Sequence, residues 1–492
     1  MPKPLNILFV ASEAVPFAKT GGLGDVAGAL PRALAKLGHQ VRLVMPYYGW
    51  LEGSAYRFTD WLTIDVPMPG GSMRAPVLRG LLPDAPVPVL AVRHDPYFAR
   101  AGIYGEAADY PDNLDRFAFF GRAAVELLPL LRAEGGWTPD ILHGHDWPAA
   151  LSLVYLRTLN DWDAPNRKIG TLFTIHNIGY QGHFPAAEYA KTGLPQELFT
   201  PGGLEFYGKV NLLKGGLLYG DALNTVSPTY AQEIQRPEFG FGLDGVLRER
   251  ADRLFGVVNG IDVETWNPET DPFLPSRYGA SSLAGKQGCK TALQREMRLP
   301  VRDVPLLATV SRFGWQKGLD LIADALPTLL KADVQFVLLG TGDAGLEERF
   351  RRLHAGHPDT FGLTIGFDEG LAHRIEGGAD FFVMPSRYEP CGLSQLYSLR
   401  YGTVPIVRRT GGLADTVTPY GAGEPATGFQ FTDPTPEALL DAIRSALSVY
   451  RDRAAWQRLM TAGMRVDVSW DKSARAYDDL YRTALALRGV PK

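Results

Sequence analysis

The stretch LNILFVA, residues 5–11, is followed by a helical pattern at residues 25–37 and by a second apolar stretch at residues 41–45. Apolar runs of this kind are typical of parallel strands that are covered on both faces. The segment between them has apolar residues at helical spacing. Pro31 lies inside that segment, and it predicts a kink or a later start of the helix. Together the three segments predict a strand–helix–strand unit.

The same alternation of short apolar runs and amphipathic segments continues along the chain, and it is more regular in the second half. This order favours a doubly wound sheet with crossover helices. Further strands are expected at residues 87–92, 140–143, 169–175, 222–226, 306–310, 334–339, 363–367, 380–384 and 404–407.

We therefore predict an α/β protein with two Rossmann-like domains. The first domain covers residues 1–254 and the second residues 255–471. The segment 259–282 is a candidate linker, because it is rich in residues that favour loops. The terminal segment 472–492 has a helical pattern, and we expect it to join the first domain.

Composition and charge disfavour several classes of protein. The 492 residues include 50 Lys and Arg against 54 Asp and Glu, and a net charge of −4 favours neither nucleic-acid binding nor a charged scaffold. No apolar run reaches the roughly 18 residues that a membrane span needs. The apolar start is short and interrupted by polar residues, which favours a buried strand over a signal peptide. Two cysteines, Cys289 and Cys391, cannot form a disulfide framework, so we expect a cytoplasmic protein.

A glycine-rich loop, KTGGLGD at residues 19–25, lies between the first strand and the first helix. Glycines allow a ligand to approach the backbone, and a helix N-terminus favours an anion such as a diphosphate. A tight turn without a ligand is the alternative. The spacing is neither the dinucleotide-binding fingerprint nor a Walker A loop, which disfavours NAD binding and ATP hydrolysis.

Two cations follow a strand of the second domain, in SRFGWQKG at residues 311–318. Arg312 and Lys317 would lie at the carboxyl edge of the sheet, where open α/β sheets bind ligands. A planar guanidinium and a mobile ammonium suit a diphosphate leaving group. Two solvated surface cations are the alternative.

Other polar residues also follow predicted strands, in HGHDW (143–147), TIHN (174–177) and EPCGL (389–393). A His-x-His pair beside an aspartate could suggest a metal, but the spacing of further ligands is missing, so buried structural histidines are favoured. Cys391 is either a reactive thiol or a small packed residue, and buried cysteines are usually inert.

Taken together, these segments resemble the glycogen synthases of bacteria and the starch synthases of plants. These are retaining glycosyltransferases of the GT-B architecture, in which two Rossmann-like doubly wound domains face each other across a deep cleft. The resemblance covers nearly the whole chain. The matching motifs are KTGGLGDV (19–26), HGHDW (143–147), HNIGYQG (176–182), VNGID (258–262), SRFGWQKGLDL (311–321), PSRYEPCGLSQLYSLRYG (385–402) and TGGLADTV (410–417).

The resemblance implies transfer of glucose from a nucleoside diphosphate glucose, usually ADP-glucose in bacterial members, to the non-reducing 4-hydroxyl of an α-1,4-glucan. The configuration is retained, and no metal or other cofactor is implied. Many retaining GT-B enzymes have a second glutamate eight residues after the first. Tyr397 stands at that position here, which matches the glycogen and starch synthase pattern.

The resemblance also implies roles for single residues. Arg312 and Lys317 would hold the diphosphate, Glu389 the glucose hydroxyls, and His176 would lie beside the anomeric carbon. The implied binding residues are Lys19, Gly21 and Gly22 on the first-domain side of the donor, Asp146 and Asn259 as further sugar contacts, the backbone of Cys391, Gly392 and Leu393 along the glucose, and Tyr388 near the base.

Retaining glycosidases use a pair of carboxylates, one of them as nucleophile. The sequence offers no evident nucleophile, so the family analogy favours front-face attack, with the leaving phosphate accepting the proton of the acceptor. Two alternatives stay open. One is a retaining nucleotide-sugar transferase with a small acceptor, and the other is an inactive glucan-binding paralogue, although Arg312, Lys317 and Glu389 are all present.

Overall fold

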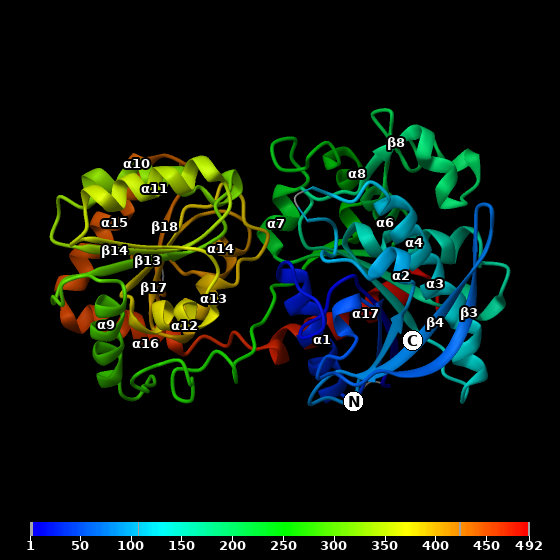
Figure 1. The fold of residues 1–492 in the computed structure, drawn as a ribbon, viewed down its shortest axis with the longest axis horizontal. Helices are drawn as coiled ribbons and strands as arrows, with labels where there is room; N and C mark the ends of the chain where they lie inside the picture. Colours follow the sequence, from blue (N-terminus) through cyan, green and yellow to red (C-terminus); the bar gives the residue numbers. More distant parts are fainter. Residues whose placement is uncertain (1–2, 107, 423–424, 491–492) are drawn as a thin grey trace. The chain divides into compact units, whose positions relative to one another are not determined.

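The structure is a computed structural model that describes residues 3–106, 108–422 and 425–490. The chain forms two compact units. The first comprises Met1–Val226, Ala231–Val257 and Trp470–Lys492, and the second comprises Ser227–Tyr230 and Val258–Ser469. Each unit is built around one large sheet with helices on both faces (Figure 1).

The sheet of the first unit has nine strands in the order β12-β11-β7-β6-β1-β2-β5-β4-β3. Neighbouring strands run parallel from β12 to β5, and β4 and β3 are added antiparallel at one edge. The strands are β1 (Asn6–Val10), β2 (Gln40–Pro46), β3 (Thr59–Met68), β4 (Gly71–Leu81), β5 (Pro88–Val92), β6 (Ile141–His145), β7 (Gly170–Ile175), β11 (Ala222–Thr225) and β12 (Leu254–Gly256). A small antiparallel sheet, β8 (His183–Pro185), β10 (Lys209–Asn211) and β9 (Glu205–Phe206), follows β7.

Helices cover both faces of this sheet because the parallel strands are apolar on both sides. On one face α4 packs between α3 and α6, and on the other face α17 packs against α1. The helices of this part of the chain are α1 (Gly22–Lys36), α2 (Asp95–Phe98), α3 (Asn113–Ala133), α4 (Asp146–Thr158), α5 (Ala164–Arg167), α6 (Leu212–Tyr219), α7 (Pro228–Glu233), α8 (Asp244–Glu249) and α17 (Trp470–Leu487). Short 3₁₀ turns lie at Gly49–Leu51, Ala186–Thr192, Gln196–Leu198 and Ala251–Arg253.

The second unit has a six-stranded parallel sheet in the order β15-β14-β13-β16-β17-β18. Its buried apolar side chains form one core under α10, α11 and α15 and another under α9 and α12, which lie on opposite faces (Figure 1). The elements are α9 (Ala284–Glu296), β13 (Leu306–Val310), a 3₁₀ turn (Trp315–Lys317), α10 (Leu319–Leu329), β14 (Gln335–Gly340), α11 (Ala344–Gly356), β15 (Phe361–Ile365), α12 (Glu369–Gly378), β16 (Phe381–Met384), α13 (Ser394–Arg400), β17 (Val404–Arg408), α14 (Gly411–Thr416), β18 (Phe429–Phe431), α15 (Pro436–Arg451) and α16 (Arg453–Met464).

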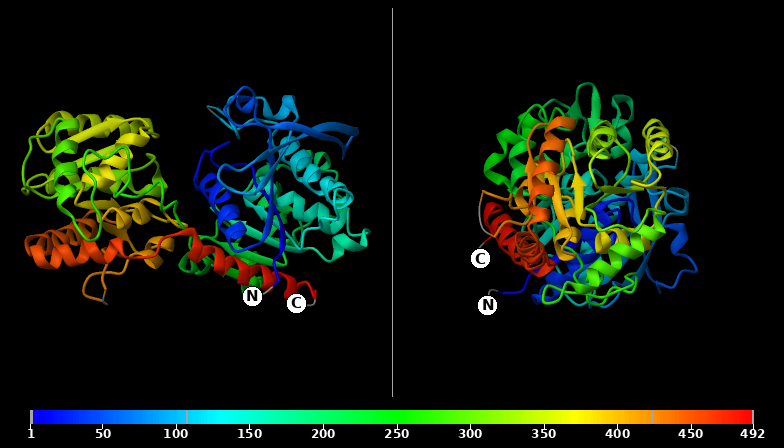
Figure 2. Two further views of the ribbon diagram at one scale, coloured as in Figure 1. Left: turned by 90° about the horizontal axis from the view of Figure 1, so that it is seen from below. Right: turned by 90° about the vertical axis from the view of Figure 1, so that its left-hand side faces the viewer.

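The last helix, α17, belongs to the first unit and not to the second, which it follows in the sequence. It lies along α1 and contacts β7 and β11 (Figure 2). Tyr477 and Tyr481 are fully buried, and their hydroxyls bond to Asn224 on β11 and to His143 on β6. Burial of an aromatic ring contributes about 1.5–3 kcal/mol, and the paired hydroxyls avoid the cost of lost solvation.

The predicted strands are confirmed, with boundaries shifted by up to two residues. A late start of the first helix is wrong, because α1 begins at Gly22 and continues through Pro31. Pro31 is buried within the apolar face of α1, so packing outweighs the one hydrogen bond that proline cannot donate. The β3–β4 hairpin was not expected, because its residues alternate between buried and exposed and do not form an apolar run.

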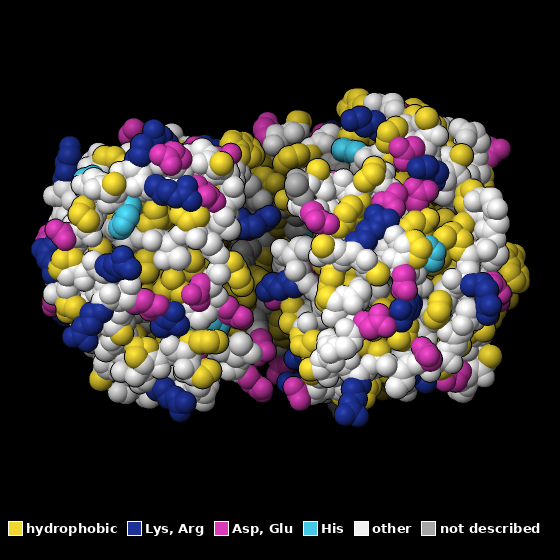
Figure 3. All heavy atoms as spheres, viewed as in Figure 1, with side chains coloured by type: hydrophobic (Ala, Val, Ile, Leu, Met, Phe, Trp, Pro, Cys, Tyr) yellow, Lys and Arg dark blue, Asp and Glu magenta, His cyan; other side chains and the backbone are white. Residues whose placement is uncertain are grey.

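Charged side chains of both signs are interspersed over the face shown in Figure 3, as the small net charge suggests. Within the part of the chain that the structure describes, no helix has both the length and the apolar character that crossing a bilayer requires.

Candidate active site

A pocket of about 200 Å³ opens at the carboxyl ends of β13 and β16 in the second unit. Arg312 and Lys317 line it together with the hydroxyl-bearing residues Ser386 and Ser394. This is the edge where parallel α/β sheets bind ligands. The sequence-predicted cations therefore both reach the expected pocket. Arg312 is exposed, and among the described residues no hydrogen bond or ion pair holds its guanidinium.

Lys317 and Glu389 form an ion pair at this pocket. The Lys317 Nζ lies 2.9 Å from Oε1 and 2.7 Å from Oε2 of Glu389, and Ser386 Oγ donates to the same Oε2 at 2.9 Å. The Glu389 side chain is 5% exposed and the Lys317 side chain 23%. Gly318 makes this approach possible, because it has a φ of +65° and a Cβ there would lie 2.2 Å from the carbonyl oxygen of Pro385.

The loop that carries Glu389 is supported from behind by the second TGGL segment of the chain. The Gly412 N–H donates to the carbonyl oxygens of Glu389 and Pro390 at 3.1 and 3.2 Å. A Cβ on Gly411 would lie 1.9 Å from the Glu389 carbonyl oxygen, so only glycine permits the contact. This glycine pair holds the Glu389 loop in place through its backbone.

Cys391, Gly392 and Leu393 continue the loop into α13. The Cys391 thiol is buried beside the backbone of Asn259, and burial raises its pKa to about 12. The thiol therefore stays protonated, as expected of a packed residue. Gly392 has a φ of +75°, and the Gln395 amide donates to the carbonyls of Cys391 and Gly392 at 3.0 and 2.9 Å.

Tyr388 is 8% exposed, whereas Trp315, whose ring centroid is 6.4 Å away, is 66% exposed. Trp315 belongs to the SRFGWQKG motif, in which the two cations and not the ring indicate a ligand site from sequence. Arg387 stacks 5.3 Å over the Trp315 ring and makes two hydrogen bonds, 2.7 and 2.6 Å long, to Asp320 on α10. The ion pair between Arg387 and Asp320 holds the chain next to Lys317 in place.

In the first unit, the glycine loop leads directly into a helix. Gly21 is the N-cap residue and α1 begins at Gly22, so the N–H groups of Gly22 and Leu23 have no carbonyl partner within the helix. Lys19 is half-exposed, and its Nζ lies 2.7 Å from Oδ1 of Asp25. The arrangement favours an anion at this helix end.

Glu13 organises that loop, and sequence reasoning missed it. Its carboxylate is 2% exposed and accepts four hydrogen bonds. The donors are the Thr20 N–H at 2.5 Å, the Thr20 hydroxyl at 2.7 Å, the Gly21 N–H at 3.2 Å and the Tyr104 hydroxyl at 2.7 Å. The signal in the sequence is a carboxylate that lies three residues after the end of a buried strand.

His145, Asp146 and His176 come together because β6 and β7 are neighbours in register, with His145 opposite Thr174. The His176 Nε2 lies 2.9 Å from Nδ1 of His145. Asp146 has a φ of +54°, which turns its carboxyl back so that Oδ1 accepts the His176 N–H at 2.7 Å. The bend at Asp146 therefore positions the segment that carries His176.

Burial keeps these groups uncharged. Burial raises the pKa of Asp146 to about 8, although backbone N–H groups of His176 and Asn177 partly oppose the rise. Burial lowers the pKa of His176 to about 3. At neutral pH the imidazole is neutral, and the Asp146 carboxyl is largely protonated.

His143 is a fully paired structural histidine. Its Nδ1 and Nε2 lie 2.9 Å from the Tyr481 hydroxyl and 2.7 Å from the Thr174 hydroxyl. Among the residues that the structure describes, no group of three or more His, Cys, Asp and Glu side chains is arranged to hold a metal ion.

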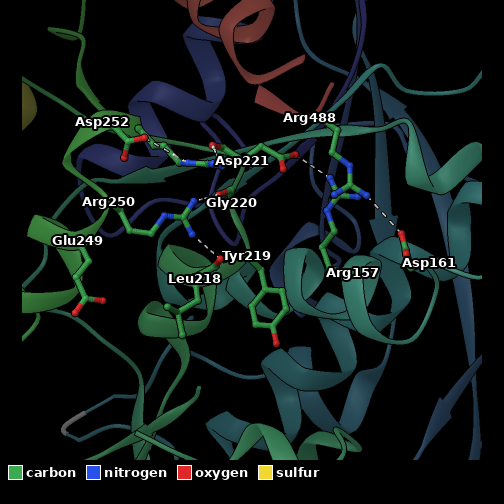
Figure 4. Close-up of a pocket in the computed structure, with 11 residues that line it drawn as sticks. Arg157, Asp161, Leu218, Tyr219, Gly220, Asp221, Glu249, Arg250, Asp252 and Arg488 are labelled. Atoms are coloured by element: carbon green, nitrogen blue, oxygen red, sulfur yellow. Dashed lines mark hydrogen bonds and ion pairs between the residues drawn. The ribbon is translucent and has the colours of Figure 1, made fainter. Parts of the chain in front are cut away.

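A wider depression, of about 650 Å³, lies at the opposite edge of the first-unit sheet, beside the starts of β7 and β11 (Figure 4). Arg157 and Arg488 lie side by side there, and they bond to Asp221 and Asp161. Arg250 donates to two backbone carbonyls. Because these cations already have partners and no predicted site residue lies there, the depression is not the candidate active site.

Family models match both halves of the chain. The model described as the starch synthase catalytic domain matches residues 6–249, and that of glycosyl transferases group 1 matches residues 293–459.

Full-length relatives give the same result. The glycogen synthase of Anaeromyxobacter sp. (strain Fw109-5) is 51% identical over 98% of this chain and 100% of the relative. The glycogen synthase of Syntrophotalea carbinolica is 47% identical over 98% of this chain and 99% of the relative. The chain belongs to the glycogen and starch synthase family. The predicted resemblance is thereby confirmed, and the protein is a glycosyltransferase.

Solved structures agree with this assignment. The catalytic domain of starch synthase IV from Arabidopsis thaliana, bound to ADP and acarbose, is 33% identical and has a TM-score of 0.89 over 98% of this chain and 100% of that one. Sucrose-phosphate synthase from Thermosynechococcus elongatus is 18% identical with a TM-score of 0.59, a likeness of fold alone. The two Rossmann-like units of this family member thus have the GT-B fold that the sequence predicted.

Within each unit the structure brings most of the predicted residues of this family together. In the second unit, the predicted residues lie near the carboxyl ends of β13 and β16. They are Arg312, Lys317, Glu389 and the backbone of residues 391–393. In the first unit His176 and Asp146 are in contact, and Lys19 lies beside the start of α1. These are two sets of polar groups, each at the carboxyl edge of a parallel sheet.

Proposed function

We propose that this chain transfers glucose from ADP-glucose to the 4-hydroxyl at the non-reducing end of an α-1,4-glucan such as glycogen, with retention of configuration. The starch synthase structure that is similar over the full length contains ADP and acarbose, which supports an adenine nucleotide and a glucan as ligands. The observation that carries the proposal is the pocket that Arg312 and Lys317 line and at whose edge Lys317 pairs with Glu389.

Arg312 and Lys317 are proposed to bind the diphosphate. When the bond between the anomeric carbon and the phosphate oxygen breaks, negative charge develops on the departing ADP. Fixed cations at that position stabilise the transition state more than the ground state. Because the Lys317 ammonium is paired with Glu389, it is oriented before the donor arrives.

Glu389 is proposed to hold hydroxyls of the donor glucose. Its carboxylate accepts two hydrogen bonds from Lys317 and one from Ser386, which leaves about one of its four acceptor positions, on Oε1, for a hydroxyl. The backbone of Cys391, Gly392 and Leu393 would follow the glucose and phosphate, and Asn259 would add a sugar contact. Tyr388 would lie near the base, where the exposed Trp315 offers a second ring.

In the first unit, Lys19 and the backbone of Gly21 and Gly22 are proposed to bind the donor, and the N–H offered is that of Gly22, because the Gly21 N–H already donates to Glu13. Residues 1–254 with 472–492 would bind the acceptor, and residues 255–471 would bind the nucleotide sugar. Asp146 is proposed as a sugar contact that donates its carboxyl proton, because burial raises its pKa to about 8.

His176 is proposed to lie beside the anomeric carbon as a neutral group. Its pKa of about 3 excludes a stored positive charge at neutral pH, so it acts by orientation and through its backbone carbonyl. The acceptor 4-oxygen forms the new bond on the face that the phosphate leaves. Its proton passes to the departing phosphate oxygen, which receives the electron pair of the broken bond.

The test is an initial-rate comparison of radiolabelled ADP-glucose and UDP-glucose with glycogen as acceptor. We expect label in the polymer and faster transfer from ADP-glucose. Label in a small product, with none in glycogen, would favour the transferase with a small acceptor. Glycogen binding without release of ADP or UDP would favour an inactive paralogue.

We also propose a cytoplasmic location, because both cysteines are buried and free. No cofactor, metal, nucleic acid or membrane is proposed as a partner. The only ligands required are the nucleotide sugar and the glucan.

A further inference from the structure

Two aromatic residues of the first unit occupy a backbone conformation that bulky side chains rarely adopt. Tyr207, in the turn between β9 and β10, has a φ of +48°, and Phe241 has a φ of +49°. Each such residue costs of the order of 1–3 kcal/mol and persists only where the surrounding structure enforces it. Both side chains nevertheless point to solvent, with Tyr207 82% and Phe241 41% exposed. The fold therefore tolerates strain in order to present two rings at its surface.

The two residues lie close together, because the backbone next to Phe241 packs against the rings of Phe206 and Tyr207. A Cβ on Gly242, the residue after Phe241, would lie 2.9 Å from the Phe206 ring and 3.5 Å from the Tyr207 ring. The rings of Phe206 and Tyr207 are themselves 4.7 Å apart in an edge-to-face arrangement. We call Phe206, Tyr207 and Phe241 the aromatic platform.

The platform is fixed from below by a buried amide. Gln181, 5% exposed, donates to the Phe241 carbonyl at 3.1 Å and accepts from Asn211 on β10 at 2.7 Å. The His183 ring stacks on Phe206 at 5.4 Å. These contacts hold the turn of the small sheet, whose strand β8 is labelled in Figure 1, against the loop at Phe241.

The same amide connects the platform to the candidate active site. Gln181 lies in HNIGYQG, the segment that begins with His176 at the end of β7. The segment that supports the platform therefore leaves the first-unit sheet at its carboxyl edge, which is the edge that carries His176. The exposed side chains of His183 and Lys209 and the half-exposed Glu205 flank it with hydrogen-bonding groups.

We propose that the aromatic platform is a glucan-binding subsite, which holds a stretch of the acceptor chain away from the end that is extended. This inference rests on the proposed function. Glucose rings have an apolar face that stacks on exposed aromatic rings and a rim of hydroxyls that bonds to flanking polar groups. A polymeric acceptor has sugar units to spare for such a subsite, whereas a trisaccharide has few.

The test uses Tyr207→Ala and Phe241→Ala in the full chain, with Trp162→Ala as the matched control. Trp162 is 78% exposed on the same unit, in the loop before α5. We expect each platform variant to weaken glycogen binding in affinity electrophoresis two- to tenfold, the range of a lost aromatic contact. The KM for glycogen should rise by the same factor, and the KM for maltotriose by less. Trp162→Ala should match the wild type in both.

Tyr207→Gly separates binding from folding, because glycine removes the ring and also relieves the positive φ. We expect this variant to unfold at the same or a higher temperature than the wild type and still to bind glycogen more weakly. Tyr207→Phe should retain binding.

Glycogen affinity equal to that of the wild type in Tyr207→Ala and Tyr207→Gly would overturn the proposal. So would a change of oligomeric state in these variants with glycogen affinity unaltered, which would make the platform a contact between copies of the chain. If the wild type transfers no glucose at all, the proposed function fails. The direct binding comparison then still decides whether the platform holds glucan.

Discussion

The ammonium of Lys317 lies 2.7 Å from Oε2 of Glu389, so the group proposed to receive the diphosphate and the group proposed to hold the sugar are paired with each other. Glu389 is 5% exposed and Lys317 is 23% exposed, so solvent weakens this pair less than it would a surface pair. Each residue keeps the other oriented towards the pocket. Replacement of either one should therefore affect both ends of the donor.

Lys317→Ala tests the cation. It removes the positive charge at the departing phosphate and leaves the buried Glu389 carboxylate with Ser386 alone. We expect turnover to fall by roughly 10²–10³, the usual cost of one such donor. Glycogen binding should change little. Steady-state rates with saturating ADP-glucose measure the effect, and the exposed Lys331→Ala in the same unit is the control. Wild-type turnover would disprove the assignment.

Glu389→Gln tests the carboxylate at constant size. The amide cannot accept from Lys317 and Ser386 as a charged group does, so the ammonium loses its fixed orientation. We expect a lower kcat and poorer discrimination between ADP-glucose and ADP-galactose, because hydroxyl recognition is lost. Competition between the two donors measures this. Unchanged rate and selectivity would contradict a sugar-binding role for Glu389.

Glu13→Gln tests the loop at the start of α1. The wild-type carboxylate accepts from Thr20 and Gly21 N–H groups, whereas an amide would place its own donors against them. Leaving buried donors unmatched costs about 1–3 kcal/mol, which urea unfolding would measure. We also expect the KM for ADP-glucose to rise, because the loop no longer holds Lys19 and Gly21 in one conformation.

Thr20→Val is the milder comparison, since it removes one donor to Glu13 and leaves the two N–H groups in place. A Glu13→Gln protein that loses stability but keeps the wild-type KM for ADP-glucose would show that Glu13 only stabilises the fold.

Asp146→Asn tests the buried carboxyl through pH. The pKa of Asp146 is about 8 in the folded chain against 3.8 when unfolded, so the folded state binds more protons between these values. Its contribution to stability is complete below about pH 4 and is lost as the pH rises towards 8. Asparagine does not titrate and tolerates the positive φ.

In the variant, the decline in unfolding free energy across this range should be shallower by up to about 1.4 kcal/mol per pH unit. Denaturant unfolding between pH 4 and 8 measures it. Glu376, whose pKa burial also raises to about 8, titrates in both proteins and keeps part of the slope. Identical slopes for wild type and variant would show that Asp146 is ionised in the fold.

The sequence predicted the parallel strands because apolar runs report burial on both faces. It could not predict β3 and β4, whose residues face solvent on one side. The position after a strand indicated Arg312 and Lys317, and the resemblance to the family added Glu389. The sequence did not show that Gly411 and Gly412 support the Glu389 loop, because they do so through backbone contacts with residues more than 20 positions away.

Glu13 illustrates the same limit. Its importance comes from four donors, and Tyr104 is 91 positions away in the chain. The aromatic platform was hidden for another reason, since a positive φ at Tyr207 or Phe241 cannot be inferred from side chains that normally avoid it.

We propose above that the pocket at the ends of β13 and β16 binds the diphosphate of the donor. Calorimetric titration of ADP into the wild type, Arg312→Ala, Lys317→Ala and the double variant tests it most directly. We expect tight binding to the wild type and about tenfold weaker binding for each single variant, as for the loss of a charge-assisted hydrogen bond worth about 1.5 kcal/mol. The double variant should bind ADP more weakly than either single variant. Equal ADP affinity in all four proteins would contradict it.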